Sequence, residues 1–137
     1  MNTFARTVDI MHRALDVSTV RRQVLSNNLT NADVPNFKRS DVNFESELKR
    51  ALESEKRRPP LELSMTHEKH IPNWKERDYR DVQIRRVLDH TSSYKNCGNN
   101  VDPEQEIMLA TQNQMSYNLF VQAISFEFSL LNRLLRS

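Results

Sequence analysis

The stretch that decides this chain's arrangement is Asn27-Asn28-Leu29-Thr30-Asn31-Ala32-Asp33-Val34-Pro35-Asn36-Phe37-Lys38-Arg39. Three asparagines and one aspartate within seven residues carry short side chains that compete for backbone hydrogen bonds and favour the end of a helix. Pro35 disfavours the α conformation at Val34, and Asn36 tolerates the left-handed conformation. The stretch therefore predicts a helix end followed by a sharp turn. An ordinary helix stop is the simplest alternative, although the order of residues is more specific than a stop requires.

An amphipathic helix is predicted upstream of this turn, from Phe4 to Leu29. Its first apolar residues recur at steps of four, three and four, which places them on one face of a helix. That face begins with Phe4, Val8, Met11 and Leu15. Several β-branched valines lower the intrinsic helix propensity, so we expect this helix to need a partner helix.

A longer helix is predicted from Pro103 to about Leu135. Asp102 is a good N-cap, and Pro103 stands where its missing donor is harmless. The seam then steps alternately by three and four through Ile107, Ala110, Gln114, Tyr117, Val121, Ile124, Phe128, Leu131 and Leu135. A helix of roughly 33 residues is ~50 Å long, which is more than the first helix can cover. We expect part of its apolar face to meet other subunits, although such stripes more often form an intramolecular core.

The region between the terminal helices is polar. A shorter helix is predicted from Asp41 to Arg58, and Pro59-Pro60 is expected to end it. Leu61 to Thr66 and Tyr79 to Ile84 alternate apolar and polar residues, so each predicts a short strand, and a mobile loop is the alternative. The predicted fold is mainly α, an elongated, coiled-coil-like pairing of long N- and C-terminal helices with a small irregular or β middle. The predicted regions are 1–37 for the first helix and turn, 38–100 for a variable middle and 101–137 for the last helix.

The composition excludes several classes of protein. The 137 residues carry a net charge of +2, which gives no electrostatic footprint for nucleic acid or an anionic membrane. Cys97 is the only cysteine, so an intramolecular disulfide and a cysteine metal cluster are excluded. One glycine cannot supply a glycine-rich phosphate loop. The N-terminus lacks the basic and apolar regions of a secretory signal, and no apolar run approaches the ~20 residues that span a bilayer.

No group of residues has the spacing of a catalytic or metal site. His67 and His70 are three positions apart, but their neighbours do not complete a ligand set. Cys97 and His90 could imitate a nucleophile and a base, but no third group is placed to orient them. We therefore expect no enzyme activity, no metal, no cofactor and no small-molecule substrate. A hydrolase is the alternative that loss of activity in Cys97→Ser would support.

Residues 28–39 resemble the signature of the bacterial flagellar rod and hook proteins, the axial protein family, which is approximately N-(I/L)-A-N-A-x-T-P-G-Y-K. We call residues 27–39 the signature turn. The chain departs from the pattern at Thr30, Val34, Asn36 and Phe37, which stand for Ala, Thr, Gly and Tyr and keep size or backbone role.

Three further segments are similar to axial proteins. Ser40 to Glu45 resembles the RDVDFE that follows the signature in a proximal rod protein. Asn96 to Asp102 resembles the DGNNVD before the C-terminal helix of axial proteins, with Cys97 in place of the Asp. Leu61 to His70 is similar to a rod-protein segment at the same place. The resemblance therefore covers separate parts of the chain in the expected order.

The resemblance implies a structural subunit of the proximal flagellar rod, which self- and co-assembles through its terminal helices to transmit torque. The implied partners are other copies of the chain, the rod proteins FlgC, FlgF and FlgG, the protein FliE and the flagellar type III export apparatus. The implied location is the periplasmic rod of the basal body, reached without a cleaved signal peptide. The alternative is a cytoplasmic helical adaptor or chaperone that binds a partner through its C-terminal helix.

The resemblance and the apolar pattern also select residues. The signature-turn residues are Asn28, Asn31, Ala32, Pro35, Asn36 and Phe37. The residues expected to pack helices or subunits are Leu15, Leu25, Leu29, Val121, Ile124, Phe128 and Leu131. Phe4 and Val8 resemble the Phe-x-x-x-hydrophobic element that docks early axial substrates at the export gate, and the first turn of the helix face explains them equally well.

Overall fold

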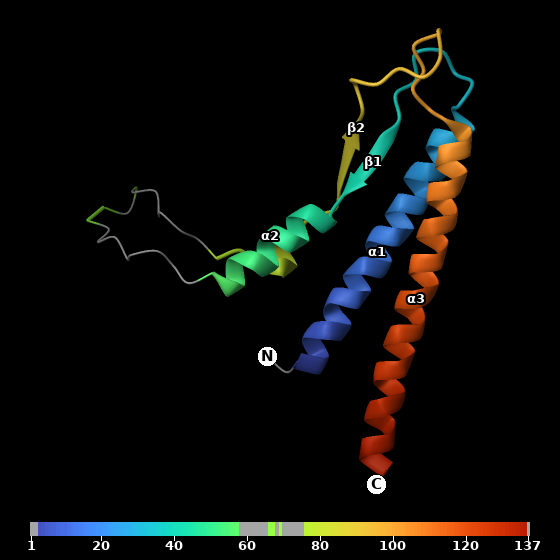
Figure 1. The fold of residues 1–137 in the computed structure, drawn as a ribbon. Helices are drawn as coiled ribbons and strands as arrows, with labels where there is room; N and C mark the ends of the chain where they lie inside the picture. The colour runs from blue at the N-terminus through green and yellow to red at the C-terminus, as the bar shows by residue number, and fades with distance from the viewer. Residues whose placement is uncertain (1–2, 58–65, 68, 70–75, 137) are drawn as a thin grey trace. The chain divides into compact units, whose positions relative to one another are not determined.

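The computed structural model describes residues 3–57, 66–67, 69 and 76–136. Its elements are, in chain order, α1 (Thr3–Thr30), β1 (Ser40–Asn43), α2 (Glu45–Lys56), the 3₁₀ helix η1 (Tyr79–Asp81), β2 (Arg85–Leu88) and α3 (Pro103–Arg136) (Figure 1). They form two compact units, one from the residues up to 42 and from 86 onward, and the other from residues 43–85. The predicted mainly helical fold, with a small β-element in the middle of the chain, is confirmed.

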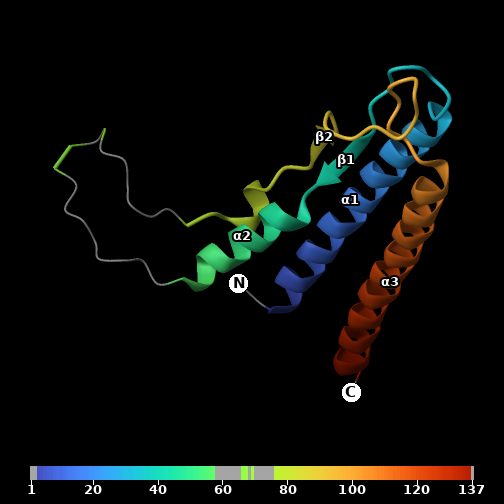
Figure 2. The same cartoon turned by 45° about the horizontal axis from the view of Figure 1, so that its top comes forward.

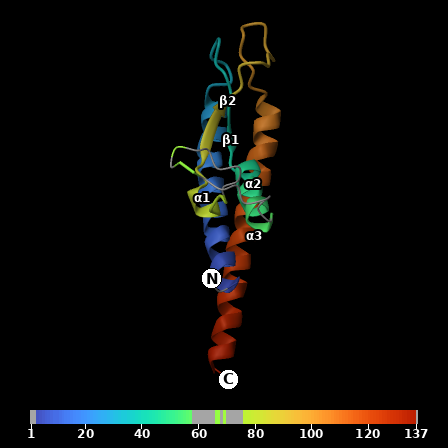
Figure 3. The ribbon, with the colours of Figure 1, turned by 90° about the vertical axis from the view of Figure 1, so that its left-hand side faces the viewer.

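In the first unit, α1 and α3 pack side by side, and α3 continues past the N-terminal end of α1 (Figures 1, 2 and 3). Asn28 lies beside Glu106 near the turn, and Asn113 lies beside Ser18 further along. The rings of Phe4 and Phe128 meet edge to face near the other end, with centroids 5.7 Å apart. Positions therefore fall along α1 as they rise along α3, which makes the pair antiparallel and confirms the predicted helix pairing.

The first helix buries one face against its partner. Its buried apolar residues are Val17, Val24 and Leu25, and Val17 and Val24 have the seven-residue spacing of a helix seam. Two polar residues, Ser18 and Asn28, are buried on the same face. The helix tightens at its end, where Ala32 N donates to Leu29 O at 3.2 Å. The helix predicted from Phe4 to Leu29 is thus confirmed.

The last helix begins where its sequence predicts. Asp102 Oδ1 accepts a hydrogen bond from Glu104 N at 3.0 Å, so Asp102 is the N-cap. Acidic Glu104 and Glu106 occupy the first turn, and Arg133 and Arg136 the last, which complements the helix dipole. Most of the predicted apolar seam, however, is not buried in the single chain. Its members Ile107, Tyr117, Val121, Phe128 and Leu135 are exposed in the single chain.

The two strands form one two-stranded sheet. Asp89 N donates to Arg39 O at 2.9 Å, which pairs the residue after β2 with the residue before β1 and makes the strands antiparallel. The strand predicted over Tyr79 to Ile84 is wrong, because Tyr79–Asp81 is a 3₁₀ turn and the strand begins at Arg85. The cause is Asp78, whose side chain accepts from Arg80 N at 2.9 Å and starts the turn.

The second unit packs α2 against η1. Phe44, Ala51 and Tyr79 supply its buried apolar residues, and Arg77 N donates to Ser54 Oγ at 3.0 Å. The helix predicted over Asp41 to Arg58 exists, but its predicted start is wrong because residues 40–43 are extended in β1. The strand predicted at Leu61 to Thr66 and the Pro59-Pro60 stop lie outside the described residues, apart from Thr66.

None of the helices in the described ranges combines the length and the apolar character needed to cross a bilayer.

Candidate functional site: the signature turn and the loop before α3

The signature turn and the loop before α3 (residues 89–102) lie together at one end of the α1–α3 pair (Figures 1 and 2). Asn36 N donates to Cys97 O at 3.0 Å, which joins the tips of the two segments directly. The remaining contacts come from three buried asparagines, an ion pair and two lysines. They hold segments that are more than sixty positions apart in sequence.

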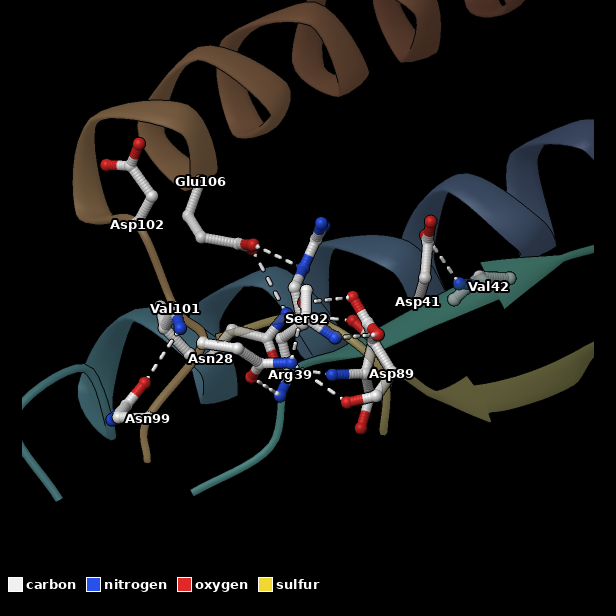
Figure 4. Close-up of polar contacts among 12 residues, drawn as sticks. Asn28, Arg39, Asp41, Val42, Asp89, Ser92, Asn99, Val101, Asp102 and Glu106 are labelled. Carbon is white, nitrogen blue, oxygen red and sulfur yellow. Dashed lines mark hydrogen bonds and ion pairs between the residues drawn. The ribbon is translucent and has the colours of Figure 1, made fainter. Parts of the chain in front are cut away.

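Asn28 fastens the end of α1 to the start of β1. Its side chain is fully buried. Its Nδ2 donates to Ser40 O at 2.8 Å, and its Oδ1 accepts from Ser40 N at 3.0 Å, so the amide pairs with Ser40 as a neighbouring strand would. Its Nδ2 also donates to Glu106 Oε2 at 3.1 Å. One side chain therefore connects α1, β1 and α3 (Figure 4).

Glu106 brings a carboxylate into this buried corner. It is 1% exposed, and its Oε1 lies 3.2 Å from Arg39 Nε (Figure 4). Neither Arg39 Nε nor Glu106 Oε1 makes an aligned hydrogen bond among the described residues, so their contact is mainly a charge pair. Removing either partner would leave the other charge buried, which is costly in a medium of low dielectric constant.

Asn99 satisfies the carbonyl groups of the turn itself. Its buried Nδ2 donates to three of them, Asn31 O at 3.1 Å, Ala32 O at 3.0 Å and Val34 O at 2.8 Å. Its Oδ1 accepts from Val101 N at 2.7 Å, which fixes the chain just before α3. Each of these three carbonyls also accepts a second hydrogen bond, from Val34 N, Lys95 Nζ and Phe37 N respectively. Asn99 thus joins three carbonyl groups of the turn to the loop before α3.

Asn100 makes similar hydrogen bonds, which join Arg39 at the end of the signature turn to the loop before α3. Its Oδ1 accepts from Arg39 N at 2.7 Å, and its Nδ2 donates to Asp89 O at 2.8 Å and Ser92 Oγ at 3.1 Å. Asp89 itself accepts from the Ser92 hydroxyl at 2.6 Å and from the backbone N–H groups of Thr91 and Ser92. These hydrogen bonds, the Ser92 hydroxyl foremost, lower the pKa of Asp89 to about 2.

Asn36 and Gly98 form the closest approach between the two segments. Asn36 has a φ of 58° and is, among the described residues, the non-glycine with positive φ. Gly98 has a φ of 77°, and a Cβ placed on it would lie 2.7 Å from Asn36 Oδ1. A side chain at position 98 would therefore meet both an unfavourable backbone conformation and a steric clash.

Two lysines extend the contacts to the outer edge of the site. Lys95 Nζ donates to Ala32 O at 2.9 Å and to Asp33 Oδ1 at 2.8 Å. The hydrogen bond from Lys95, and then its charge, lower the pKa of Asp33, and the same hydrogen bond raises the pKa of Lys95. Lys38 Nζ donates to Gly98 O at 2.9 Å. Because Asp33 is almost fully exposed, water screens its ion pair and the backbone contacts matter more.

The predicted turn residues differ in how deeply the structure buries them. Asn28 and Ala32 are buried in the contacts above, and Asn31 Nδ2 bonds back to Asn27 O at 2.7 Å. Pro35 and Asn36 are exposed, and Phe37 is half-buried. Asn36 has the left-handed conformation that the sequence predicts. A direct role of these residues in assembly stays a prediction.

The residues predicted to pack helices or subunits divide into three groups. Leu25 is buried, and Leu15, Ile124 and Leu131 are half-buried. Leu29, Val121 and Phe128 are exposed, each at least 40%. Phe4 and Val8 are half-buried, and Phe4 contacts Phe128. Their packing against other subunits, or against an export gate, stays a prediction.

Five residues with long-range polar contacts are ones that local sequence reasoning did not select. They are Arg39, Asn99, Asn100, Glu106 and Asn113. Asn99 and Asn100 fall within the segment that resembles DGNNVD, which is the one signal that could have found them. Glu106 and Asn113 interrupt an apolar helix at a seven-residue spacing, which is compatible with a buried position but does not demand one.

The arrangement suits a structural role. It consists of amides, backbone groups and ion pairs that hold the signature turn, β1 and the start of α3 together. Within the described ranges, no three His, Cys, Asp or Glu side chains come together as a metal site.

No protein-family model matches the chain. Among curated proteins, it is 44% identical to the flagellar basal body rod protein FlgB of Borreliella burgdorferi over 136 residues, which cover 99% of this chain and 100% of the relative. It is 45% identical to FlgB of Borrelia hermsii over 96% of this chain and 97% of the relative. It is 30% identical to FlgB of Bacillus subtilis over 98% and 97% of the two chains. The chain therefore belongs to the family of flagellar basal body rod proteins FlgB.

Proposed function

We propose that this chain, a structural subunit of the flagellar basal body rod, assembles through the apolar face that α3 leaves exposed. Family membership supports a structural protein and not an enzyme, as the sequence predicts. In this proposal, the signature turn and the loop before α3 fix the positions of the two terminal helices relative to each other while neighbouring subunits bind along them. Torque passes from subunit to subunit through these helices.

The exposed apolar side chains of α3 are the observation that carries this proposal. They are Ile107, Met108, Met115, Tyr117, Leu119, Val121, Phe126, Phe128, Leu130, Leu134 and Leu135. Soluble monomers rarely leave so many large apolar side chains in contact with water along one element, and such surfaces usually mark a binding site. α3 also extends beyond α1, so its last turns have no partner helix in the first unit (Figures 1 and 3).

The proposed neighbours are other copies of the chain, FlgC, FlgF, FlgG and FliE. Contacts between unlike surfaces of identical or similar subunits generate an open helical assembly when the rotation does not close, which suits a rod. A cytoplasmic adaptor would also use an exposed α3 face, but relatives of nearly the same length named as rod proteins favour the rod.

We propose export by the flagellar type III apparatus without a cleaved signal peptide. Phe4 and Val8 would engage the export gate before folding. In the folded chain the Phe4 ring packs on Phe128, so the element is partly covered. The same residues can therefore serve export first and helix packing afterwards.

A charge placed on the exposed apolar face tests the assembly proposal. Val121→Asp should abolish incorporation into rods and motility in a flagellated host that lacks its own copy, because an unpaired carboxylate would be buried at the subunit contact. Circular dichroism of the purified variant should keep the helical signal of the parent, since Val121 is exposed in the single chain. Gln122→Asp, the adjacent exposed polar position, is the matched control and should support motility. Normal rods from Val121→Asp would contradict the proposal.

A further inference from the structure

The two edges of the β1–β2 sheet differ, because side chains close the edge of β1 that points away from β2. Asn28 donates to Ser40 O at 2.8 Å and accepts from Ser40 N at 3.0 Å. Val42 N donates to Asp41 Oδ1 at 2.7 Å (Figure 4), and Arg21 Nη2 donates to Val42 O at 3.4 Å. The backbone groups that β1 turns outward at Ser40 and Val42 therefore all have partners.

The outer edge of β2 has no such cover among the described residues. Asp89 N donates to Arg39 O, and the direction of the backbone groups alternates from one residue to the next along a strand. The backbone groups of Arg86 and Leu88 therefore point away from β1, and no hydrogen bond joins them to another described residue. All of β2 is exposed, with Val87 at 49% and Leu88 at 53%. β1 lies between β2 and α1, so the open edge is the one farther from the helix (Figures 1 and 2).

The sequence of this open edge is complementary to itself. An exposed strand edge is a template for pairing with another strand. If a second copy pairs in the antiparallel direction with Arg86 opposite Leu88, the outward backbone groups of both copies meet. This register places Val87 opposite Val87 at a two-fold axis and Arg85 opposite Asp89 on both sides of it. Opposite charges at opposed positions stabilise an antiparallel pair.

Other registers are less favourable for the charges. A shift that places Arg86 opposite Arg86 sets two like charges against each other, which destabilises a strand pair. Either neighbouring register that keeps the hydrogen bonds also loses both pairs of Arg85 with Asp89. The charges therefore favour the register that is centred on Val87.

Asp89 can join such a pair while it keeps its own hydrogen bonds. Among the described residues, its Oδ1 accepts from Thr91 and Ser92, and its Oδ2 accepts only from the Ser92 hydroxyl, at 2.6 Å. A carboxylate oxygen can accept two hydrogen bonds, so Oδ2 has a position left for a guanidinium. Arg85, Val87 and Asp89 alternate along the strand and share one face of it.

We propose that β2 is a self-association surface, through which two copies of the chain join their two-stranded sheets into one four-stranded antiparallel sheet about a two-fold axis at Val87. A two-fold contact is closed and does not extend into a filament. It is therefore distinct from the open contact proposed along α3, does not depend on it, and applies to free chains. Because one short strand buries little area, the pair forms at high concentration and separates on dilution.

Disulfide cross-linking of the purified full-length chain tests the pairing and its register. In a Cys97→Ser background, Val87→Cys places two thiols opposite each other at the two-fold axis. The Cα atoms of such a non-hydrogen-bonded pair are about 4.5 Å apart, which suits a disulfide. We expect a covalent dimer under mild oxidation, at a rate that falls as the salt concentration rises.

Leu88→Cys in the same background is the matched control, because Leu88 is adjacent and similarly exposed but lies opposite Arg86. Its two Cα atoms would be about 8–9 Å apart, which is too far for a disulfide. Val87→Cys should therefore cross-link on the order of tenfold faster than Leu88→Cys. Equal rates would overturn the proposal, and the edge would then be open to a strand of a different protein.

Charge reversal distinguishes this pairing from chance collision. In the Val87→Cys chain, Arg85→Glu sets a carboxylate against Asp89 and should slow cross-linking by roughly tenfold, because both charge pairs become repulsive. Arg86→Glu changes the net charge equally but places its carboxylate opposite Leu88, so it should slow the reaction less. An unchanged rate with Arg85→Glu would overturn the pairing.

A final variant separates this contact from the one proposed along α3. The Val87→Cys cross-link should form at the same rate when Val121→Asp is added, because β2 and the exposed face of α3 are different surfaces. Loss of the cross-link in that chain would overturn the proposal, because the contact would then depend on α3. Failure of Val121→Asp to block rods would leave the cross-link unaffected, so the two proposals can fail separately.

Discussion

Asn28 and Glu106 are 78 positions apart in sequence, and they meet through Asn28 Nδ2 and Glu106 Oε2 at 3.1 Å in a fully buried corner. The same Asn28 amide pairs with both backbone groups of Ser40. The end of α1, the start of β1 and the first turn of α3 are thus joined at one side chain. A polar contact of this kind has one geometry, whereas apolar surfaces tolerate sliding.

Asn28→Ala should be strongly destabilising. The change removes three hydrogen bonds and leaves Ser40 and Glu106 with unsatisfied groups, so the free energy of unfolding should fall by roughly 2–4 kcal/mol. Denaturant titration followed by circular dichroism measures it. Asn132→Ala, an exposed asparagine of α3, is the control and should change stability by less than about 0.5 kcal/mol. Equal stability of the two variants would contradict a structural role for Asn28.

Gly98→Ala should lower the free energy of unfolding by about 1–2 kcal/mol. The added Cβ is unfavourable at a positive φ, and it would clash with Asn36 Oδ1. The two causes can be separated in a double-mutant cycle with Asn36→Gly. That change removes the clashing side chain and suits the φ of 58° at position 36. Gly98→Ala should therefore cost less in the Asn36→Gly background than in the parent. Identical costs in both backgrounds would mean that the clash contributes nothing.

Lowering the pH should destabilise the loop before α3, because Asp89 accepts its hydrogen bonds as a carboxylate and becomes protonated in acid. Its pKa is about 2 in the folded chain, against 3.8 for an ordinary aspartate. Because the folded pKa is the lower one, the contribution of Asp89 to stability is complete above pH 3.8 and is lost as the pH falls toward 2. Asp89→Asn should flatten the fall in melting temperature over this pH window. Asp16→Asn, at an exposed position of α1, is the control, and a profile of Asp89→Asn that overlays the parent would exclude this contribution.

The sequence predicted the features that depend on neighbouring residues. The start of α3 follows from Asp102 and Pro103, and the left-handed Asn36 follows from the chemistry of the turn, so both were predictable. The strand was misplaced because alternation over Tyr79 to Ile84 carried more weight than the capping side chain of Asp78. In that segment local turn chemistry overrode a two-residue period.

Features that depend on distant residues could not be predicted in the same way. The side chain of Asn99 donates hydrogen bonds to carbonyl groups more than sixty positions away, and nothing in the sequence around Asn99 indicates which groups these are. The burial of Glu106 and Asn113 was not predictable from the apolar pattern either, because that pattern selects only apolar residues for burial.

Amide hydrogen exchange of the purified chain across a concentration series tests the assembly through α3 most directly. Amides near Asn28 and Asn99 should be protected at every concentration, because the contacts of the turn lie within one chain. Amides of the last turns of α3, which extend beyond α1, should exchange rapidly in dilute solution and gain protection as the concentration rises. Full protection of those turns at every concentration would contradict the proposal, because the exposed face of α3 would then need no neighbour.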